Sequence, residues 1–203
     1  MKSFKIQDLI SVGIYAAIYY LLMAIAVFAL HMGFGIFSYM FIPSGTALVA
    51  GIVYLLMTHR IPKFGAITIL GLVNAAFFMF SGYFALSFIP SIVCGILADV
   101  IQHKTNLPEK IRTLLGYTIF NFSLTGPILP MWFMQDAYKE ALASKGKDAS
   151  YITEILKPVN NMTFALIILS IIVCSIIGLW IANNIYQKHF AKTKGQTNEN
   201  IIR

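Results

Sequence analysis

Residues Ser11 to Leu30 read SVGIYAAIYYLLMAIAVFAL, a run of twenty residues without a charge or a proline. At about 1.5 Å per residue, a helix of this length crosses the hydrocarbon core of a bilayer. We therefore predict a first membrane-spanning helix over about residues 9–30. It is too long for the apolar region of a signal peptide, and no small-residue cleavage site follows it, so we expect it to be retained.

One stripe of this helix carries small residues. Gly13, Ala17 and Ala24 are separated by four and then seven positions, which places them on one side of a helix with Ala16 beside them. A smooth stripe lets another helix approach closely. Two interpretations stay open: the stripe packs against the same chain, since membrane helices are rich in Gly and Ala, or it docks a partner protein.

The composition is that of an integral membrane protein. The 203 residues are 58% hydrophobic and 11% charged, and the mean hydropathy is positive, which excludes a soluble globular domain. A net charge of +7 would suggest nucleic acid in a soluble protein, but here the Lys and Arg residues fall in connections and tails, so we expect no nucleic-acid partner. Cys94 and Cys174 lie inside apolar runs and are expected to pack as small hydrophobic residues.

Further apolar runs predict an all-α membrane bundle of six spanning helices in a single domain, residues 1–203. After the first helix, the predicted spans are Ile36 to Met57, Phe64 to Gly82, Tyr83 to Ile101, Ile111 to Met134 and Met162 to Tyr186. The third and fourth nearly touch, so we predict a helical hairpin with a tight turn at Ser81-Gly82. Residues 187–203 form a polar tail.

The basic residues predict the orientation. Six crossings place eleven of the fifteen Lys and Arg on one side: Lys2, Lys5, Arg60, Lys63, Lys104, Lys110, Arg112, Lys188, Lys192, Lys194 and Arg203. The other four lie in one long loop whose acidic residues balance them. Because cytoplasmic loops carry an excess of Lys and Arg, we predict a multi-pass membrane protein with both termini in the cytoplasm.

That long loop, Gln135 to Asn161, would then be outside. Its pattern predicts two short helices, about Asp136 to Ser144 and Asp148 to Leu156, broken at Lys145-Gly146-Lys147. Long structured loops often act as lids over sites, although a solvated linker is an equal alternative. The first outer connection, His31 to Phe37, combines two glycines with aromatic residues and is either part of such a cover or an interfacial turn.

Uncharged polar residues gather in the outer halves of helices three to six. Thr118, Asn121, Thr125 and Trp132 share one face of the fifth helix, provided that Pro127 and Pro130 do not shift its phase. Other helices add Asn74, Ser87, Asn160 and Asn161 at similar depth. We interpret Asn74, Ser87, Asn121, Thr125, Trp132, Asn160 and Asn161 as candidate substrate-binding residues. The alternative is helix-to-helix hydrogen bonding, which every membrane bundle uses.

The sequence has no pattern that indicates an enzyme. It contains no HExxH, GxSxG or phosphate-binding loop, and the four His residues stand singly, so we predict no catalytic residues, no metal site and no cofactor. Asp99 is the one candidate for a charge at membrane depth, followed by His103. Near the end of its helix this carboxylate opposes the helix dipole and needs a cationic neighbour, so we predict an interfacial or partner contact rather than chemistry.

The first helix also carries a resemblance. Asp8-Leu-Ile followed by Gly13-Ile-Tyr-Ala-Ala-Ile-Tyr19 resembles the opening of the Trep_Strep, or MptD-like, substrate-binding subunits of energy-coupling-factor transporters. The resemblance covers most of the chain, including six helices, cytoplasmic ends and a long outer loop between helices five and six. In that superfamily two alanines four apart on the first helix form part of the docking surface, and Gly13 and Ala17 correspond to them here, with Gly in place of the first Ala.

The resemblance implies a subunit that binds a small micronutrient, a vitamin or a precursor, from outside. It would dock on a transmembrane coupling protein driven by two cytoplasmic ATPase subunits, and its ligand would sit in the outer half among helices four to six and the covering loops. Two other classes stay open: a stand-alone secondary transporter or channel, and a membrane enzyme or assembly factor without a recognisable motif. A lone ion-coupled transporter should carry intramembrane charges, whereas this core has almost none.

Overall fold

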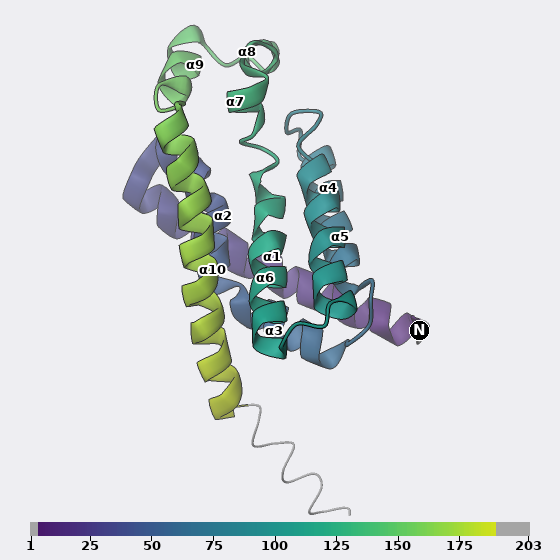
Figure 1. The fold of residues 1–203 in the computed structure, drawn as a ribbon. Coiled ribbons are helices and arrows are strands. Elements are labelled where there is room, and N and C mark those ends of the chain that lie inside the picture. Colours follow the sequence, from purple (N-terminus) through teal and green to yellow (C-terminus); the bar gives the residue numbers. More distant parts are fainter. Residues whose placement is uncertain (1–3, 190–203) are drawn as a thin grey trace, which may run out of the picture.

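The computed structural model describes residues 4–189, which form α-helices and two 3-10 helices and contain no β-strand (Figure 1). The elements are α1 Ile6–Phe34, η1 Gly35–Phe41, α2 Ile42–Val49, α3 Gly51–Arg60, α4 Ala66–Phe80, α5 Ile89–Lys104, α6 Glu109–Asn121, η2 Phe122–Thr125, α7 Pro130–Phe133, α8 Gln135–Ser144, α9 Ala149–Leu156 and α10 Asn161–His189. In Figure 1, α1 crosses behind α6 and α10 at a steep angle, while α4, α5 and α6 run alongside one another.

Two helices of the described chain are long and apolar enough to cross a bilayer alone, α1 and α10, with 29 residues each. A third span results if Phe37–Val49, which comprises most of η1 and all of α2, is counted together with α3 across a bend of 50°. In contrast, α4, α5 and α6 have 15, 16 and 13 residues, and an upright span needs about 20. The count of six spans therefore stays a prediction.

The bend within the second predicted span occurs where α10 crosses it. A Cβ built on Gly178 of α10 would lie 2.1 Å from the carbonyl oxygen of Ala47, and one built on Gly51 would lie 2.8 Å from the carbonyl oxygen of Gly178. Only glycine permits backbones to approach so closely. These two glycines let α10 pack directly on the junction of α2 and α3.

The fourth predicted span begins later than expected, at Ile89 rather than Tyr83. Pro90 explains the difference, because proline has no N–H to donate to the carbonyl of Leu86 and its ring clashes with that carbonyl inside a helix. It fits the first turn of a helix, where it stands in α5. The connection between α4 and α5 is consequently longer than the turn at Ser81-Gly82 that the sequence predicted.

The fifth predicted span is also interrupted, and α6 ends at Asn121. Pro127 cannot donate a hydrogen bond to the carbonyl of Ser123, and the hydroxyl of Ser91 on α5 donates to that carbonyl instead, at 2.8 Å. The prolines therefore do shift the helical phase. Thr125 lies in η2 and Trp132 in α7, so the prediction that Thr118, Asn121, Thr125 and Trp132 share one helical face is wrong.

The bundle has two chemically different ends. At the basic end, α3 and α10 finish and α6 begins: His59 lies 3.6 Å from Glu109, and its ring centroid is 4.8 Å from that of Tyr186. The basic residues of this end are Arg60, Lys63, Lys104, Lys110, Arg112 and Lys188. At the loop end, α8 and α9 lie over the bundle (Figure 1). This separation supports the predicted orientation, which itself stays a prediction.

Asp99 has a structural role at the basic end. Its Oδ2 accepts hydrogen bonds from the backbone N–H groups of Gly65 and Thr68, at 2.7 and 3.0 Å, and from the Thr68 hydroxyl at 2.7 Å. The first turn of α4 has N–H groups without helical partners, so Asp99 caps α4 from the neighbouring helix α5. The side chain is completely buried within the chain, and the predicted interfacial or partner contact is therefore wrong. The Nδ1 of His103, one turn further along α5, lies 2.9 Å from Oδ1.

Candidate ligand-binding site

An apolar cluster occupies the loop end, separate from the main core. Its buried members come from η1, α7, α9, α10 and the segment before α7: Met40, Ile128, Met131, Ile155, Ile167 and Ile171. Aromatic residues pack around them, including Tyr39, Phe41, Phe122, Trp132, Tyr138 and Tyr151. We call these residues the loop-end cluster. Apolar surroundings with aromatic side chains are typical of sites for small organic molecules.

The predicted helices of the long loop are present as α8 and α9, and they cover the loop-end cluster. Ile155 of α9 is buried in the cluster, and the ammonium group of Lys145, between the two helices, donates to the carbonyl of Gly82 in the α4–α5 connection. The side chain of Asp148 accepts from the backbone N–H of Tyr151 and caps α9. Hydrogen bonds from Tyr151 and Ser150 lower the pKa of the Asp148 carboxyl. The segment is thus a packed cover rather than a loose linker.

Trp132 holds the start of α10. Its indole N–H donates to the carbonyl oxygen of Asn160 at 3.0 Å, and its ring centroid lies 5.5 Å from that of Phe164. The side-chain oxygen of Asn160 accepts from the backbone N–H of Thr163 at 2.9 Å, which is an N-cap interaction. Asn161 is exposed. Of the two predicted Asn residues at this helix start, one serves as a cap and the other faces away from the packed interior.

Asn121 lies at the level where α6 ends beneath the loop-end cluster. The following residue, Phe122, packs on the cluster, and Ile171, which belongs to it, stands one turn before Ser175 on α10. The Asn121 amide donates to the carbonyl of Tyr117 at 2.9 Å and to the Ser175 hydroxyl at 3.2 Å. The side chain is completely buried, and its Oδ1 has no hydrogen-bond partner among the described residues. A buried amide oxygen without a partner is costly, and a ligand donor would satisfy it.

The other predicted polar residues are mostly used within the protein. Asn74 is completely buried, accepts from the Tyr20 hydroxyl at 2.8 Å and donates weakly to Ser123 at 3.4 Å. Thr125 donates to the carbonyl of Phe122 in its own 3-10 helix. Ser87 is buried, and its hydroxyl has no partner in the part of the chain that the structure describes. Asn74 and Thr125 thus act as ties within and between helices, whereas Asn121 and Ser87 retain unused hydrogen-bonding capacity.

The small stripe on α1 is divided by the fold. Gly13, Ala17 and Ala24 are exposed, and a Cβ added at Gly13 would meet no atom within 4 Å. Ala16 is buried against the rest of the chain, at 4% exposure. Three of the four residues therefore lie on an open face of α1, which also exposes large apolar side chains such as Ile14 and Leu21.

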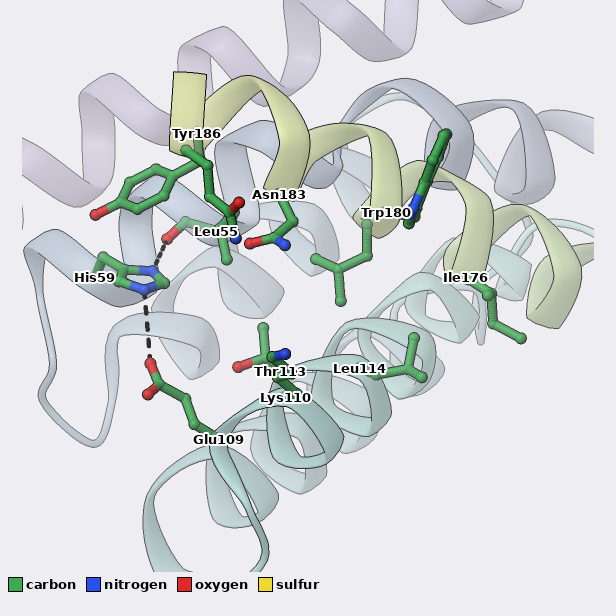
Figure 2. A pocket seen from close by; sticks show the side chains of 12 residues that line it. Leu55, His59, Glu109, Lys110, Thr113, Leu114, Ile176, Trp180, Asn183 and Tyr186 are labelled. Atoms are coloured by element: carbon green, nitrogen blue, oxygen red, sulfur yellow. Dashed lines mark hydrogen bonds and ion pairs between the residues drawn. The ribbon is translucent and has the colours of Figure 1, made fainter. Parts of the chain in front are cut away.

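A cavity of about 450 Å³ lies at the basic end, between α3, α6 and α10 (Figure 2). We call it the basic-end groove. Its lining residues are Leu55, His59, Glu109, Lys110, Thr113, Leu114, Ile176, Leu179, Trp180, Asn183, Tyr186 and Gln187. Figure 2 shows Thr113 of α6 and Asn183 of α10 on opposite sides of the space. No group of three or more metal-ligating side chains is found among residues 4–189.

The sequence interpretation missed both the partners of Asn121 and the basic-end groove. Ser175 and Tyr117 stand in apolar runs without a local signal for pairing with Asn121. The α10 wall of the groove does carry a signal: Ile176, Leu179, Trp180, Asn183 and Gln187 follow the three- and four-residue spacing of one helix face. The α3 and α6 walls depend on how the helices pack, which spacing alone does not give.

Comparison with known families assigns the chain to a family of membrane proteins. The model of a family described as a hypothetical bacterial integral membrane protein, Trep_Strep, matches residues 6–192. Neither the curated proteins nor the solved structures contain a match to this chain. The matched range includes every helix described above, from the first residue of α1 to the last residue of α10. The chain therefore belongs to the Trep_Strep family of bacterial integral membrane proteins.

Proposed function

We propose that this protein is the substrate-binding subunit of an energy-coupling-factor importer, and that it captures a small micronutrient at its loop end. The observation that carries the proposal is Asn121. Its amide is completely buried beneath the loop-end cluster, yet its Oδ1 has no partner among the described residues. A pocket that fixes a small molecule needs a few polar groups of this kind within apolar surroundings.

The cover formed by α8 and α9 supports a binding role. It seals the loop-end cluster through Ile155 and the Lys145 contact with Gly82, so a ligand beneath it would be shielded from water. Entry then requires the cover to move, as expected for a lid. The Lys145 contact joins a single flexible side chain to a backbone carbonyl at the surface, so opening breaks few interactions there.

The exposed face of α1 supports docking on a membrane partner. Gly13, Ala17 and Ala24 lie on this face beside Ile14 and Leu21. A helix of a transmembrane coupling protein can approach such a smooth surface closely. The resemblance of this helix to the substrate-binding subunits of energy-coupling-factor transporters supports a transmembrane coupling protein as this partner.

The role of Asp99 weighs against a stand-alone ion-coupled transporter. Such a transporter needs ionisable groups at membrane depth that bind and release ions. Asp99 is the acidic residue in the fourth predicted span, and its Oδ2 is fully used in capping α4. We therefore infer that the energy for uptake comes from partner ATPase subunits. We also propose that the chain itself is not an enzyme, since its sequence carries none of the catalytic motifs sought.

Purification from the native membrane tests this function. A tagged full-length chain, extracted in a mild detergent, should retain a transmembrane coupling protein and two ATPase subunits, and its bound small molecule is identified by mass spectrometry. ATP hydrolysis by the isolated complex, absent from the isolated chain, would support the assignment. A chain that transports the identified molecule in ATP-free proteoliposomes, without any partner, would contradict it.

A further inference from the structure

The basic-end groove spans about the thickness of one membrane leaflet. Along α10 its lining runs from Ile176 to Gln187, which at about 1.5 Å per residue covers ~16 Å. Half of a hydrocarbon core of ~30 Å is nearly the same length. On α10 the lining begins at Ile176, near the middle of the helix, and ends at Gln187, two residues before the last residue of the helix, His189. The groove therefore occupies the leaflet on the side of the basic end.

The lining changes from apolar to polar along this length. Leu114, Ile176 and Leu179 stand toward the middle of the bundle, whereas Lys110, Asn183 and Gln187 stand toward its basic end. Trp180 borders the space with 66% of its surface exposed. A molecule that fits this gradient is itself amphiphilic, with an apolar part toward the membrane centre and a polar part at the interface.

Lys110 is the basic residue at the polar limit of the groove that can meet an anion. The acidic side chain among the lining residues, Glu109, faces the ring of His59 at 3.6 Å (Figure 2). The Nδ1 of His59 lies 2.8 Å from the carbonyl oxygen of Leu55, which holds the ring in this orientation. Lys110, in contrast, forms no ion pair with any residue between 4 and 189. A phosphate group is the anion that a membrane surface supplies at this depth.

We propose that the basic-end groove holds one anionic phospholipid of the adjacent leaflet. Its phosphate lies at Lys110, with Asn183 and Gln187 as hydrogen-bonding groups, and an acyl chain lies along Leu114, Ile176 and Leu179. Trp180 covers the chain from the lipid side. The cavity of about 450 Å³ accommodates part of one acyl chain and the glycerol region, while the headgroup remains at the water interface.

Trp180 provides a direct readout, because bromine on a lipid chain quenches tryptophan fluorescence on contact. The full-length Trp132→Phe variant, in which Trp180 is the remaining tryptophan, is placed in nanodiscs of 90% phosphatidylcholine and 10% phosphatidylglycerol. The composition is kept constant, and the bromine is carried either by the phosphatidylglycerol or by an equal amount of the phosphatidylcholine. We expect each brominated phosphatidylglycerol to quench Trp180 about fivefold more effectively than each brominated phosphatidylcholine. This factor is the preference that one lysine near an anionic headgroup provides.

Matched variants separate a site from a general attraction to a basic surface. Lys110→Gln should remove most of the difference between the two brominated lipids, whereas Lys104→Gln, which removes a charge from the same end of the bundle, should leave it unchanged. Asn183→Leu should weaken the preference and Asn184→Leu should not, since Asn184 is exposed outside the groove. Equal quenching by the two labels in the parent protein, or equal losses in Lys110→Gln and Lys104→Gln, would overturn the proposal. Neither result depends on the substrate at the loop end.

Discussion

The amide of Asn121 on α6 donates to the hydroxyl of Ser175 on α10 at 3.2 Å, while the oxygen of the same amide has no partner among the described residues. Both side chains are completely buried. The contact with Ser175 ties two helices together, as the helix-pairing interpretation of the sequence predicts. The binding interpretation stays a prediction, and it rests on the oxygen of the same side chain.

Trp132 should report ligand binding. It lies at the edge of the loop-end cluster and contacts Phe164 and the backbone of Asn160, so a ligand beneath the cover changes its surroundings. We expect the fluorescence change on ligand addition to disappear in Trp132→Phe and to persist in Trp180→Phe, measured by titration of the purified full-length chain. A signal that survives in Trp132→Phe and is lost in Trp180→Phe would place the ligand at the other end of the bundle.

Neighbouring alanines on α1 should behave differently when enlarged. Ala17→Leu and Gly13→Leu add bulk to an exposed face, so we expect loss of co-purifying coupling protein with the fold and the ligand retained. Ala16→Leu places the same bulk into a position that is 4% exposed, and overpacking there should lower stability by about 1–3 kcal/mol. Pull-down and thermal unfolding of each variant measure the two effects. Normal partner recovery with both Gly13→Leu and Ala17→Leu would show that this face does not dock.

Removing the cap on α4 should destabilise the protein. Asp99→Ala leaves the partly buried N–H groups of Gly65 and Thr68 without their acceptor, which we expect to cost roughly 1–3 kcal/mol and to lower the unfolding temperature. The matched control, Asp136→Ala, removes an exposed carboxylate whose partner is Lys139, and it should leave the unfolding temperature nearly unchanged. The capping role would be refuted by an Asp99→Ala protein as stable as the parent.

The orientation can be measured with single cysteines in a background where Cys94 and Cys174 are alanine. Ser150→Cys, in α9 at the loop end, should react with a membrane-impermeant maleimide in intact cells. Asn106→Cys, between α5 and α6 at the basic end, should react only after the cells are opened. The reversed pattern of labelling would invert the proposed topology and place the candidate ligand site in the cytoplasm.

The length of an apolar run is enough to predict α1 and α10, the two long helices that contain no proline. The first and last spans, expected over 9–30 and 162–186, correspond to α1 and α10 with a few residues added at each end. The loop helices were also predictable, because Asp148 is a cap residue and Lys145-Gly146-Lys147 breaks the pattern. In the fourth and fifth predicted spans, Pro90 and Pro127 account for the differences, because Pro90 delays the start of α5 and Pro127 prevents α6 from continuing.

The side-chain hydrogen bonds between helices could not be predicted from a single sequence. The polar character of Asn74 and Asn121 was visible, but their partners Tyr20, Ser123 and Ser175 lie about fifty residues away. These pairings depend on the packing of several helices, as at Gly178 against Ala47. Helix packing also explains why Trp132 and Asn160 do not lie with Asn121 on one face. Trp132 donates to the backbone of Asn160, and the side chain of Asn160 caps α10.

The affinity of the Asn121→Ala variant for the small molecule that co-purifies with the parent protein tests the central claim most directly. Titration calorimetry would compare the parent, Asn121→Ala and Asn184→Ala, the last of which removes an exposed amide from the basic end of α10. Loss of a buried hydrogen-bond partner should weaken binding by roughly five- to a hundredfold, with Asn184→Ala unchanged. A folded, membrane-inserted Asn121→Ala protein that binds the molecule as tightly as the parent would contradict the account and leave Asn121 with only its structural tie to Ser175.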